Sequence, residues 1–265
     1  MSTLSRSLPT VNTAVCGGNA QVCSHKGSTW LQFIAVTLYT AEMSRSQGWN
    51  QLLTLAEEQW GLLTTRQVEA TGMAWSTLSR TVRAGTLERV AHGVYRVRGA
   101  GEIDDLGLRA AWLQLNPSIP AWERGPGDGV VSHRSAAALY GLGHLPADVY
   151  EFTLPQRRQT RRRDVRVHRG DVEGHWTTLR GLPVTKPHLI AAGLLAEGED
   201  PGAVGQMAAE ALRLGYDSTD AMAAGIAPYA KGHGFRTKDG AGLLRWLLEL
   251  NGEFASAAPH AEAGR

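Results

Sequence analysis

The stretch GLLTTRQVEATGMAWSTLSRTVRAGTLERVAHGVYRV, residues 61–97, decides the fold of the first part of the chain. Its threonines Thr64 and Thr65 can each cap a short helix ending near Thr71, because a threonine oxygen accepts hydrogen bonds from the free amides of a first helical turn. Gly72 then supplies the sharp turn that separates the two helices of a helix-turn-helix. The start of the stretch therefore predicts the first helix and the turn of that motif.

A second helix is predicted over residues 75–84, with Gly85 at its C-terminal end, where glycine is the favoured residue. Trp75, Leu78 and Val82 recur on one side of this helix and are expected to face the core. The segment LERVAHGVYRV that follows alternates in two short runs about a central His-Gly pair, a pattern typical of a β-hairpin. Two helices followed by a hairpin predict a winged helix-turn-helix.

Cationic charge is concentrated on the second helix and the hairpin. Between Trp75 and Arg98 the sequence holds five arginines and one glutamate. An α-helix fits the major groove of B-DNA, where hydroxyl and guanidinium groups bond phosphates and base edges. The sequence therefore predicts a DNA-binding module, and the alternative is a scaffolding winged helix whose polar face meets only water. The expected DNA contacts are Thr65 and Arg66 on the first helix, Ser76, Thr77, Ser79, Arg80 and Arg83 on the second, and Arg89, His92 and Arg96 on the wing.

The patterns on either side of this stretch predict the domain organisation of a chain of 265 residues. An amphipathic helix just before the motif supports it, so that the winged helix-turn-helix is expected over residues 46–100. Residues 101–250 predict a mixed α+β domain that ends in helices, which makes the whole chain α+β. Residues 1–45 are expected to be disordered or to precede the true start of translation, and residues 251–265 to form a flexible tail.

The bulk properties limit the classes of protein that fit. A net charge of +2 is too small to imply a nucleic-acid partner, so local clustering has to carry that argument. The two cysteines, Cys16 and Cys23, suggest neither a disulfide framework nor a zinc ribbon, and they fit a reducing cytoplasm. The apolar run at residues 30–39 is too short to span a bilayer. We therefore expect a cytoplasmic protein without a membrane partner.

Three short patterns predict the elements of the second domain. Ser132 is placed to cap the helix HRSAAALYGLG, and the alternation of VYEFTLP predicts a strand from Val149. The run VRVHRG alternates as well, and it is expected to pair with that strand as a hairpin whose turn lies between Gln159 and Arg162. A further short strand, GLPVT, ends at Thr185, which can cap the helix after it.

An arginine-rich segment lies at the turn of that predicted hairpin. Guanidinium groups so close together repel one another, so an anionic partner would stabilise them. The partner can be a second stretch of DNA or an acidic protein surface, and the alternative is a solvated hairpin tip on an edge strand, where charge discourages aggregation. The members of this basic patch are Arg157, Arg158, Arg161, Arg162, Arg163, Arg166 and Arg169.

No constellation of catalytic residues stands out in the sequence. His133 and Arg134 open a predicted helix, but no acid or nucleophile follows at a spacing typical of a catalytic site. The sequence shows no HExxH or other paired-ligand motif and no phosphate-binding glycine loop. It therefore predicts no metal site, no cofactor and no enzymatic activity. The other histidines considered are scattered through the second domain: His168, His175, His188 and His233.

Taken in order, these blocks resemble the AbiEi-type antitoxins of type IV toxin–antitoxin systems, which act in abortive infection. The stretch at 61–97 is similar to their N-terminal winged helix-turn-helix. The blocks SHRSAAALYGLGHL, VYEFTLP, VRVHRG and GLPVTKP, with the arginine-rich segment, resemble their second domain, so that the likeness runs over about residues 46–250. It implies a bacterial protein that binds and represses its own promoter. It also implies a second domain that counters a nucleotidyltransferase-like toxin, through direct contact or otherwise.

Two other functions remain open at this point. Some relatives of this family end in a nuclease-like domain, but the chain after GLPVTKP is rich in alanine and leucine and lacks a strand bearing paired acids and a lysine. A nuclease would have to show metal-dependent cleavage of DNA. A plain transcriptional regulator without a toxin is the stronger alternative, and the identity of the neighbouring reading frame distinguishes it from an antitoxin.

Overall fold

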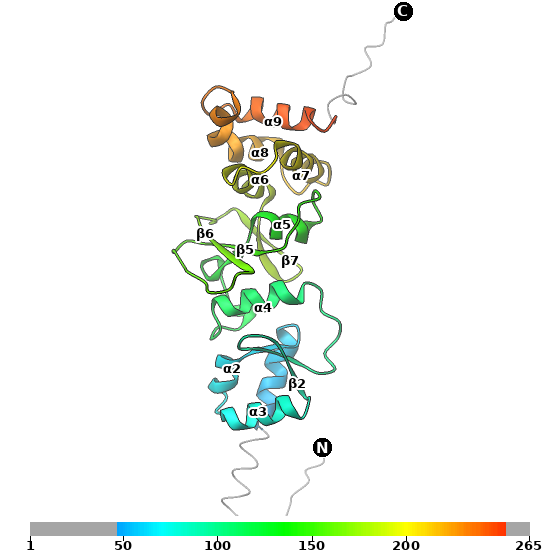
Figure 1. Cartoon of the computed structure of the whole chain (residues 1–265), viewed down its shortest axis with the longest axis vertical. Coiled ribbons are helices and arrows are strands. Elements are labelled where there is room, and N and C mark those ends of the chain that lie inside the picture. The colour runs from blue at the N-terminus through cyan, green and yellow to red at the C-terminus, as the bar shows by residue number, and fades with distance from the viewer. Residues whose placement is uncertain (1–46, 253–265) are drawn as a thin grey trace, which may run out of the picture. The chain divides into compact units, whose positions relative to one another are not determined.

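The computed structural model describes residues 47–252 and confirms the α+β class, with helices and two β-sheets (Figure 1). The expectations for residues 1–45 and for most of the C-terminal tail lie outside the described residues. Within the described part, no helix is long and apolar enough to cross a membrane.

Residues 47–98 have the predicted order of elements. The predicted hairpin is present as two antiparallel strands, and a third strand, which was not predicted from the sequence, joins them in the order β1-β3-β2. The elements are a helix over 47–58, β1 (Leu62–Thr64), α2 (Thr65–Ala70), α3 (Trp75–Arg83), β2 (Leu87–Ala91) and β3 (Val94–Val97).

The start of α2 explains why this short helix forms. Thr64 is its N-cap, and the Thr64 hydroxyl accepts from the Gln67 amide while the Gln67 side chain accepts from the Thr64 amide. This reciprocal capping box satisfies two amides that a helix otherwise leaves free. Gly72 and Gly85 follow the two helices with φ of +77° and +74°, a conformation that favours glycine. The turn and the helix ends are therefore determined by local sequence.

A small apolar core holds these elements together, and it corrects one prediction. Leu78 lies in this core, whereas Trp75, which was expected beside it, has 62% of its surface exposed. Helical side chains point back toward the N-terminus; Trp75 is the first residue of α3, so no earlier turn of the helix lies beneath its ring. The buried members of the core are Leu52, Ala56, Leu63, Val68, Leu78, Leu87 and Tyr95.

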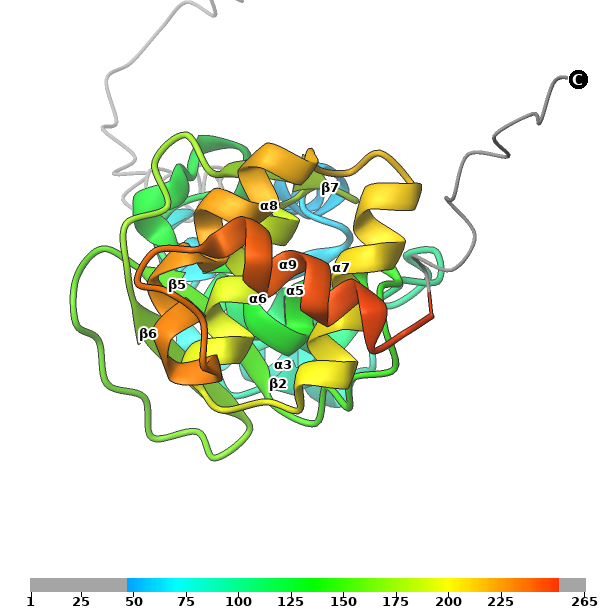
Figure 2. The ribbon, with the colours of Figure 1, turned by 90° about the horizontal axis from the view of Figure 1, so that it is seen from above.

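The rest of the chain forms a five-stranded sheet of order β6-β5-β4-β8-β7 and a group of helices, α6 to α9. Both views show α9 lying across the other helices of this group (Figures 1 and 2). The elements are α4 (Leu106–Leu115), η1 (Ala121–Glu123), η2 (Pro126–Asp128), β4 (Val130–Val131), α5 (His133–Tyr140), β5 (Tyr150–Leu154), β6 (Val165–Arg169), β7 (Trp176–Leu179), β8 (Leu182–Thr185), α6 (Pro187–Ala196), α7 (Pro201–Arg213), α8 (Thr219–Ile226), η3 (Ala227–His233) and α9 (Gly240–Glu249).

The pairing of β5 with β6 overturns the predicted arginine-rich hairpin. The two strands are parallel, with Tyr150 opposite Val165 and Leu154 opposite Arg169. Residues 155–164 therefore form a crossover that returns along the length of β5, and an extended chain of that length, at about 3.3 Å per residue, is long enough to do so. The prediction was wrong because alternation identifies strands but not their relative direction. β6 is an edge strand, as the solvated alternative assumed.

A second local prediction in this domain was also wrong. Thr185 does not cap α6: the N-cap is Lys186, without a side-chain hydrogen bond, and Pro187 opens the helix. The Thr185 hydroxyl donates instead to the Val131 carbonyl at 3.3 Å, between the parallel strands β8 and β4. Proline tolerates the first helical position because it has no amide to satisfy there, so α6 can begin without a capping side chain.

The winged helix and the following domain share apolar surface. Leu62 of β1 and Val94 of β3 belong to the larger core, together with Trp112 of α4. Polar contacts cross at the same place, since the Thr64 hydroxyl donates to the Pro117 carbonyl and Gln59 accepts from the Ala121 amide. The boundary expected near residue 100 stays a prediction. Residues on both sides of it contribute to one core.

Candidate nucleic-acid interface

The outer face of α3 is polar and cationic, as the sequence predicts. Ser76, Arg80 and Arg83 are exposed, and Thr77 and Ser79 are half-buried. The helix is held from the other side by Leu78, which is 1% exposed. Neither arginine forms an ion pair with a carboxylate among the described residues. The helix therefore presents two guanidinium groups that pair with no described carboxylate, and Leu78 anchors it from the buried side.

The start of α2 lies beside the tip of the wing. The Thr65 amide donates to the Gly93 carbonyl at 2.9 Å, which joins the first helix to the turn of the hairpin. Arg66 follows on the exposed side and pairs with Glu69 at 3.1 Å; the side chain of Arg66 is 67% exposed. An exposed pair of this kind contributes little stability, so Arg66 can exchange Glu69 for another anion at small cost.

Two of the expected DNA contacts, Arg89 and His92, lie side by side at the wing tip. The Arg89 guanidinium lies 3.0 Å from Nδ1 of His92, and both residues are exposed. The side-chain amide of Gln114 of α4 donates to the His92 carbonyl, and this hydrogen bond links the wing tip to α4. The turn is therefore supported on one side by α2 and on the other by α4.

Arg96 differs from the other predicted wing contacts. Its Nη2 donates to the carbonyls of Ala100 and Gly101 at 3.0 and 2.8 Å, and its Nε is buried. The guanidinium thus holds the connection that follows the wing, and we leave Arg96 out of the proposed interface.

Two residues at the ends of α3 were not predicted to contact DNA. Trp75 is exposed at the N-terminal end, next to Ser76. Arg98 is exposed near the C-terminal end, with its guanidinium beside Gly85. The apolar character of Trp75 hid its position, because periodicity assigned it to the core side of the helix. Arg98 follows the last strand directly, and its charge was the only available signal.

The arginine-rich segment is partly neutralised by the protein itself. Arg162 bonds Asp164 and Gln114, and its guanidinium lies 5.9 Å from the centre of the Tyr150 ring. Arg166 pairs with Glu151 and Glu197 at 3.5 and 3.2 Å. The remaining members are exposed and pair with no described carboxylate: Arg157, Arg158, Arg161, Arg163 and Arg169.

A buried carboxylate organises the start of α5. Ser132 occupies the predicted N-cap position, but its side chain makes no capping bond. Glu151 of β5 provides one instead: its Oε2 accepts from the Arg134 amide at 2.9 Å. Burial acts to raise the pKa of Glu151, but its hydrogen bonds from His168 and from that amide hold the pKa below the ordinary value. Glu151 is therefore ionised at neutral pH.

Four of the second-domain histidines, scattered in sequence, form two groups in space, while His233 lies against Trp246. His133 stacks on His168, with ring centres 3.6 Å apart. Burial and the neighbouring His168 lower the pKa of His133 to about 4, so that His133 is neutral at pH 7. In the other group, His188 lies 2.7 Å from Asp217 and 3.0 Å from His175. Sequence reasoning missed both groups, since their members come from separate elements.

A protein-family model matches the first part of the chain. Residues 50–98 match the family described as transcriptional regulator, AbiEi antitoxin. No curated protein sequence matches the chain. The matched residues contain α2, α3 and the whole wing, so the match falls on the candidate interface, and it supports a DNA-binding regulator of the antitoxin type.

Proposed function

From the match of residues 50–98 to the AbiEi antitoxin family of transcriptional regulators, we propose that this protein is a non-enzymatic antitoxin that binds and represses its own promoter. The observation that carries the proposal is the outer face of α3. It is exposed, cationic and free of acidic residues, and a buried leucine fixes its orientation. Such a helix has the dimensions and the donors needed to enter the major groove.

The assignment of contacts follows from the way a helix-turn-helix docks. The second helix enters the major groove with its N-terminal residues near the base edges, and the first helix crosses the phosphate backbone. Ser76 and Thr77 would then face bases, with Arg80 and Arg83 further along the same groove. Trp75, at the N-terminal end, adds an apolar surface of the kind that can contact a thymine methyl group.

The remaining contacts would fall on the backbone. Thr65 and Arg66 lie at the start of α2, next to the wing tip, so one strand of phosphates can meet both. Arg89 and His92 on the tip would contact phosphate or the adjacent minor groove. These groups supply affinity and orientation, while α3 supplies sequence preference.

We assign the second part of the function, neutralisation of a nucleotidyltransferase-like toxin, to the domain after residue 100. Its support is the resemblance of the second-domain blocks to those of AbiEi-type antitoxins. The exposed arginines of the segment at 155–164 offer a surface that complements an acidic protein or a nucleotide-binding cleft. Growth of cells that co-express this chain and the product of the neighbouring reading frame tests it: rescue supports an antitoxin, and continued arrest leaves a plain regulator.

Fluorescence anisotropy tests the DNA-binding function. The full chain is titrated onto DNA from its own upstream region and onto a scrambled duplex, over a series of salt concentrations. A preference of about a thousandfold or more for the upstream DNA, in the range of specific binders, is expected. Equal and steeply salt-dependent binding to both duplexes would reduce the interface to an electrostatic contact, and absence of binding would overturn the proposal.

The arginine-rich segment provides a separate prediction on the same assay. If it makes a second DNA contact, replacement of Arg157, Arg158 and Arg161 by alanine makes the negative slope of log affinity against log salt shallower. The magnitude of the slope falls by about 0.9 for each phosphate that is no longer neutralised. The matched control removes equal charge at the helical end of the chain, by replacing the exposed Arg213, Arg236 and Arg245. An unchanged slope in the segment variant would show that these arginines serve a protein partner or the solvent.

A further inference from the structure

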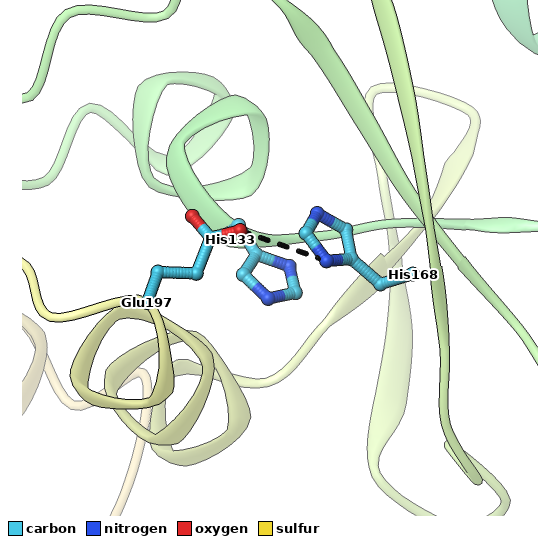
Figure 3. A group of neighbouring side chains, drawn as sticks. All are labelled: His133, His168 and Glu197. Carbon is cyan, nitrogen blue, oxygen red and sulfur yellow. Dashed lines mark ion pairs between the residues drawn. The ribbon is translucent and has the colours of Figure 1, made fainter.

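Three side chains that offer metal ligands converge between the sheet edge and two helices. His133 opens α5, His168 lies on β6, and Glu197 is the C-cap of α6. One ligand atom from each residue lies within 4.8 Å of the other two. The two imidazole rings are stacked, and Figure 3 shows the Glu197 carboxylate directed toward them. The three residues are far apart in sequence, which is why no ligand motif was visible there.

Among the described residues, the hydrogen bonds around the two histidines occupy one nitrogen of each ring. Nδ1 of His168 faces Glu197 at 3.7 Å, while its Nε2 lies 3.3 Å from the buried Glu151. A carboxylate that accepts from the outer nitrogen of a histidine is the common second partner of a metal ligand, because it fixes the tautomer and the ring orientation. Nδ1 of His133 is 3.0 Å from the Ser132 hydroxyl, which leaves its Nε2 available.

The backbone around His133 holds its ring in this place. His133 has φ of +52°, a left-handed conformation that histidine adopts more readily than most residues other than glycine. Its ring occupies the space above Gly193 of α6, where a Cβ atom would lie 2.5 Å from Nε2.

We propose that His133, His168 and Glu197 bind one divalent first-row transition metal ion, with Zn²⁺ as the representative. Two imidazoles and one carboxylate are a known ligand set for such ions, and they leave at least one position for water or another ligand. Zinc bonds of about 2.0–2.2 Å place neighbouring ligand atoms roughly 3.3 Å apart, and an imidazole binds a metal in its own ring plane. Because the two rings are stacked, binding requires one ring to turn out of the stack as the three side chains draw together. The ion would tie α5, β6 and the end of α6 to one another.

Existing ion pairs compete with the metal but do not block it. Glu197 is shared by Arg134 and Arg166, at 3.1 and 3.2 Å. The Arg166 side chain is 51% exposed, so its pair with Glu197 can be given up at little cost. Arg134 keeps Glu199 as a second partner. A metal ion can therefore replace one arginine at Glu197 without leaving a charge buried and unpaired.

Equilibrium dialysis of the full chain against Zn²⁺ tests the proposal. Because thiols also bind zinc, the background carries Cys16→Ser and Cys23→Ser, and Co²⁺ replaces Zn²⁺ in a parallel absorption measurement. We expect one equivalent of metal, a Co²⁺ spectrum without a thiolate charge-transfer band, and a melting temperature that rises with free Zn²⁺. Absence of stoichiometric binding would leave an ion-pair cluster only and overturn the proposal.

Variants identify the site within the same assay. His133→Asn keeps a residue that tolerates the left-handed conformation, and His168→Gln and Glu197→Gln keep the approximate size of the side chain. Each is expected to weaken Zn²⁺ binding at least a hundredfold and to abolish the shift in melting temperature. Glu151→Gln changes the outer partner of His168, together with the acceptor of the Arg134 amide and the partner of Arg166, and it should weaken binding about ten- to a hundredfold.

The control is His175→Gln, which removes an imidazole from the other histidine group. It should bind Zn²⁺ as the background does. If His175→Gln loses the metal while His133→Asn and His168→Gln retain it, the site is not the one proposed. Far-ultraviolet circular dichroism of every variant separates loss of a ligand from loss of the fold.

Discussion

Replacement of Arg80 by alanine is expected to weaken binding to upstream DNA by about 1–3 kcal/mol, or roughly 5- to 150-fold, if this arginine bonds a guanine edge. Arg80 is exposed on α3 and pairs with no described carboxylate, so its guanidinium is available to the groove. An alanine at this place retains the helix, because alanine has the highest helix propensity. The measurement is anisotropy on the upstream duplex and on duplexes changed at single base pairs.

The pattern of the loss distinguishes the kind of contact that Arg80 makes. A base contact relaxes the preference at one position, whereas a phosphate contact weakens all sequences alike and lowers the salt slope by about one. Arg83→Ala, one turn further along, is expected to follow one of the same two patterns. Arg245→Ala, on α9, is the control for loss of charge alone. If the DNA affinity of neither α3 variant differs from that of the control, α3 does not make the sequence-specific contacts.

Replacement of Trp112 by alanine is expected to destabilise the fold by about 3–5 kcal/mol, the range for truncating a buried aromatic residue. Trp112 of α4 is 1% exposed, and its indole N–H donates to the Gly129 carbonyl at 2.7 Å. The Arg124 guanidinium lies over its ring at 4.5 Å, and Trp60 meets it edge-on at 6.0 Å. Truncation leaves both a cavity and a carbonyl without its partner, and each adds to the loss.

Urea unfolding followed by circular dichroism measures this loss. The matched control is Trp122→Ala, which removes the same side chain from a position where it is 50% exposed. The control should change the free energy of unfolding by less than about 1 kcal/mol, since exposed positions contribute little. Equal losses in the two variants would show that the core around α4 is not packed as the structure describes.

The winged helix was predictable from sequence because its signals are local. The capping box pairs residues three apart, Gly72 and Gly85 mark the ends of the helices, and Leu78 identifies the buried side of α3. Each of these features depends on neighbours within a few positions. The exposed cations on α3 follow from the same periodicity, which is why Arg80 and Arg83 lie on the accessible side of that helix.

The second domain was less predictable because its arrangement depends on contacts between distant segments. Alternation located β5 and β6, but nothing in their sequences distinguishes parallel from antiparallel pairing. The third strand of the wing, β1, is only three residues long and was missed for lack of a pattern. The histidine cluster arises only when β6, α5 and α6 come together, so no spacing along the chain could have indicated it.

The shared core has a consequence for exchanging operator specificity between relatives. Leu62 and Val94 of the winged helix belong to the same core as the residues of α4 and of the domain that follows. A chimera joined near residue 100 would set a foreign α4 against these two side chains and against the His92 carbonyl that Gln114 holds. A transplanted segment that includes α4 and ends after Gly129 keeps the native contacts between the winged helix and α4. We therefore expect such a segment to transfer operator specificity better than one that ends near residue 100.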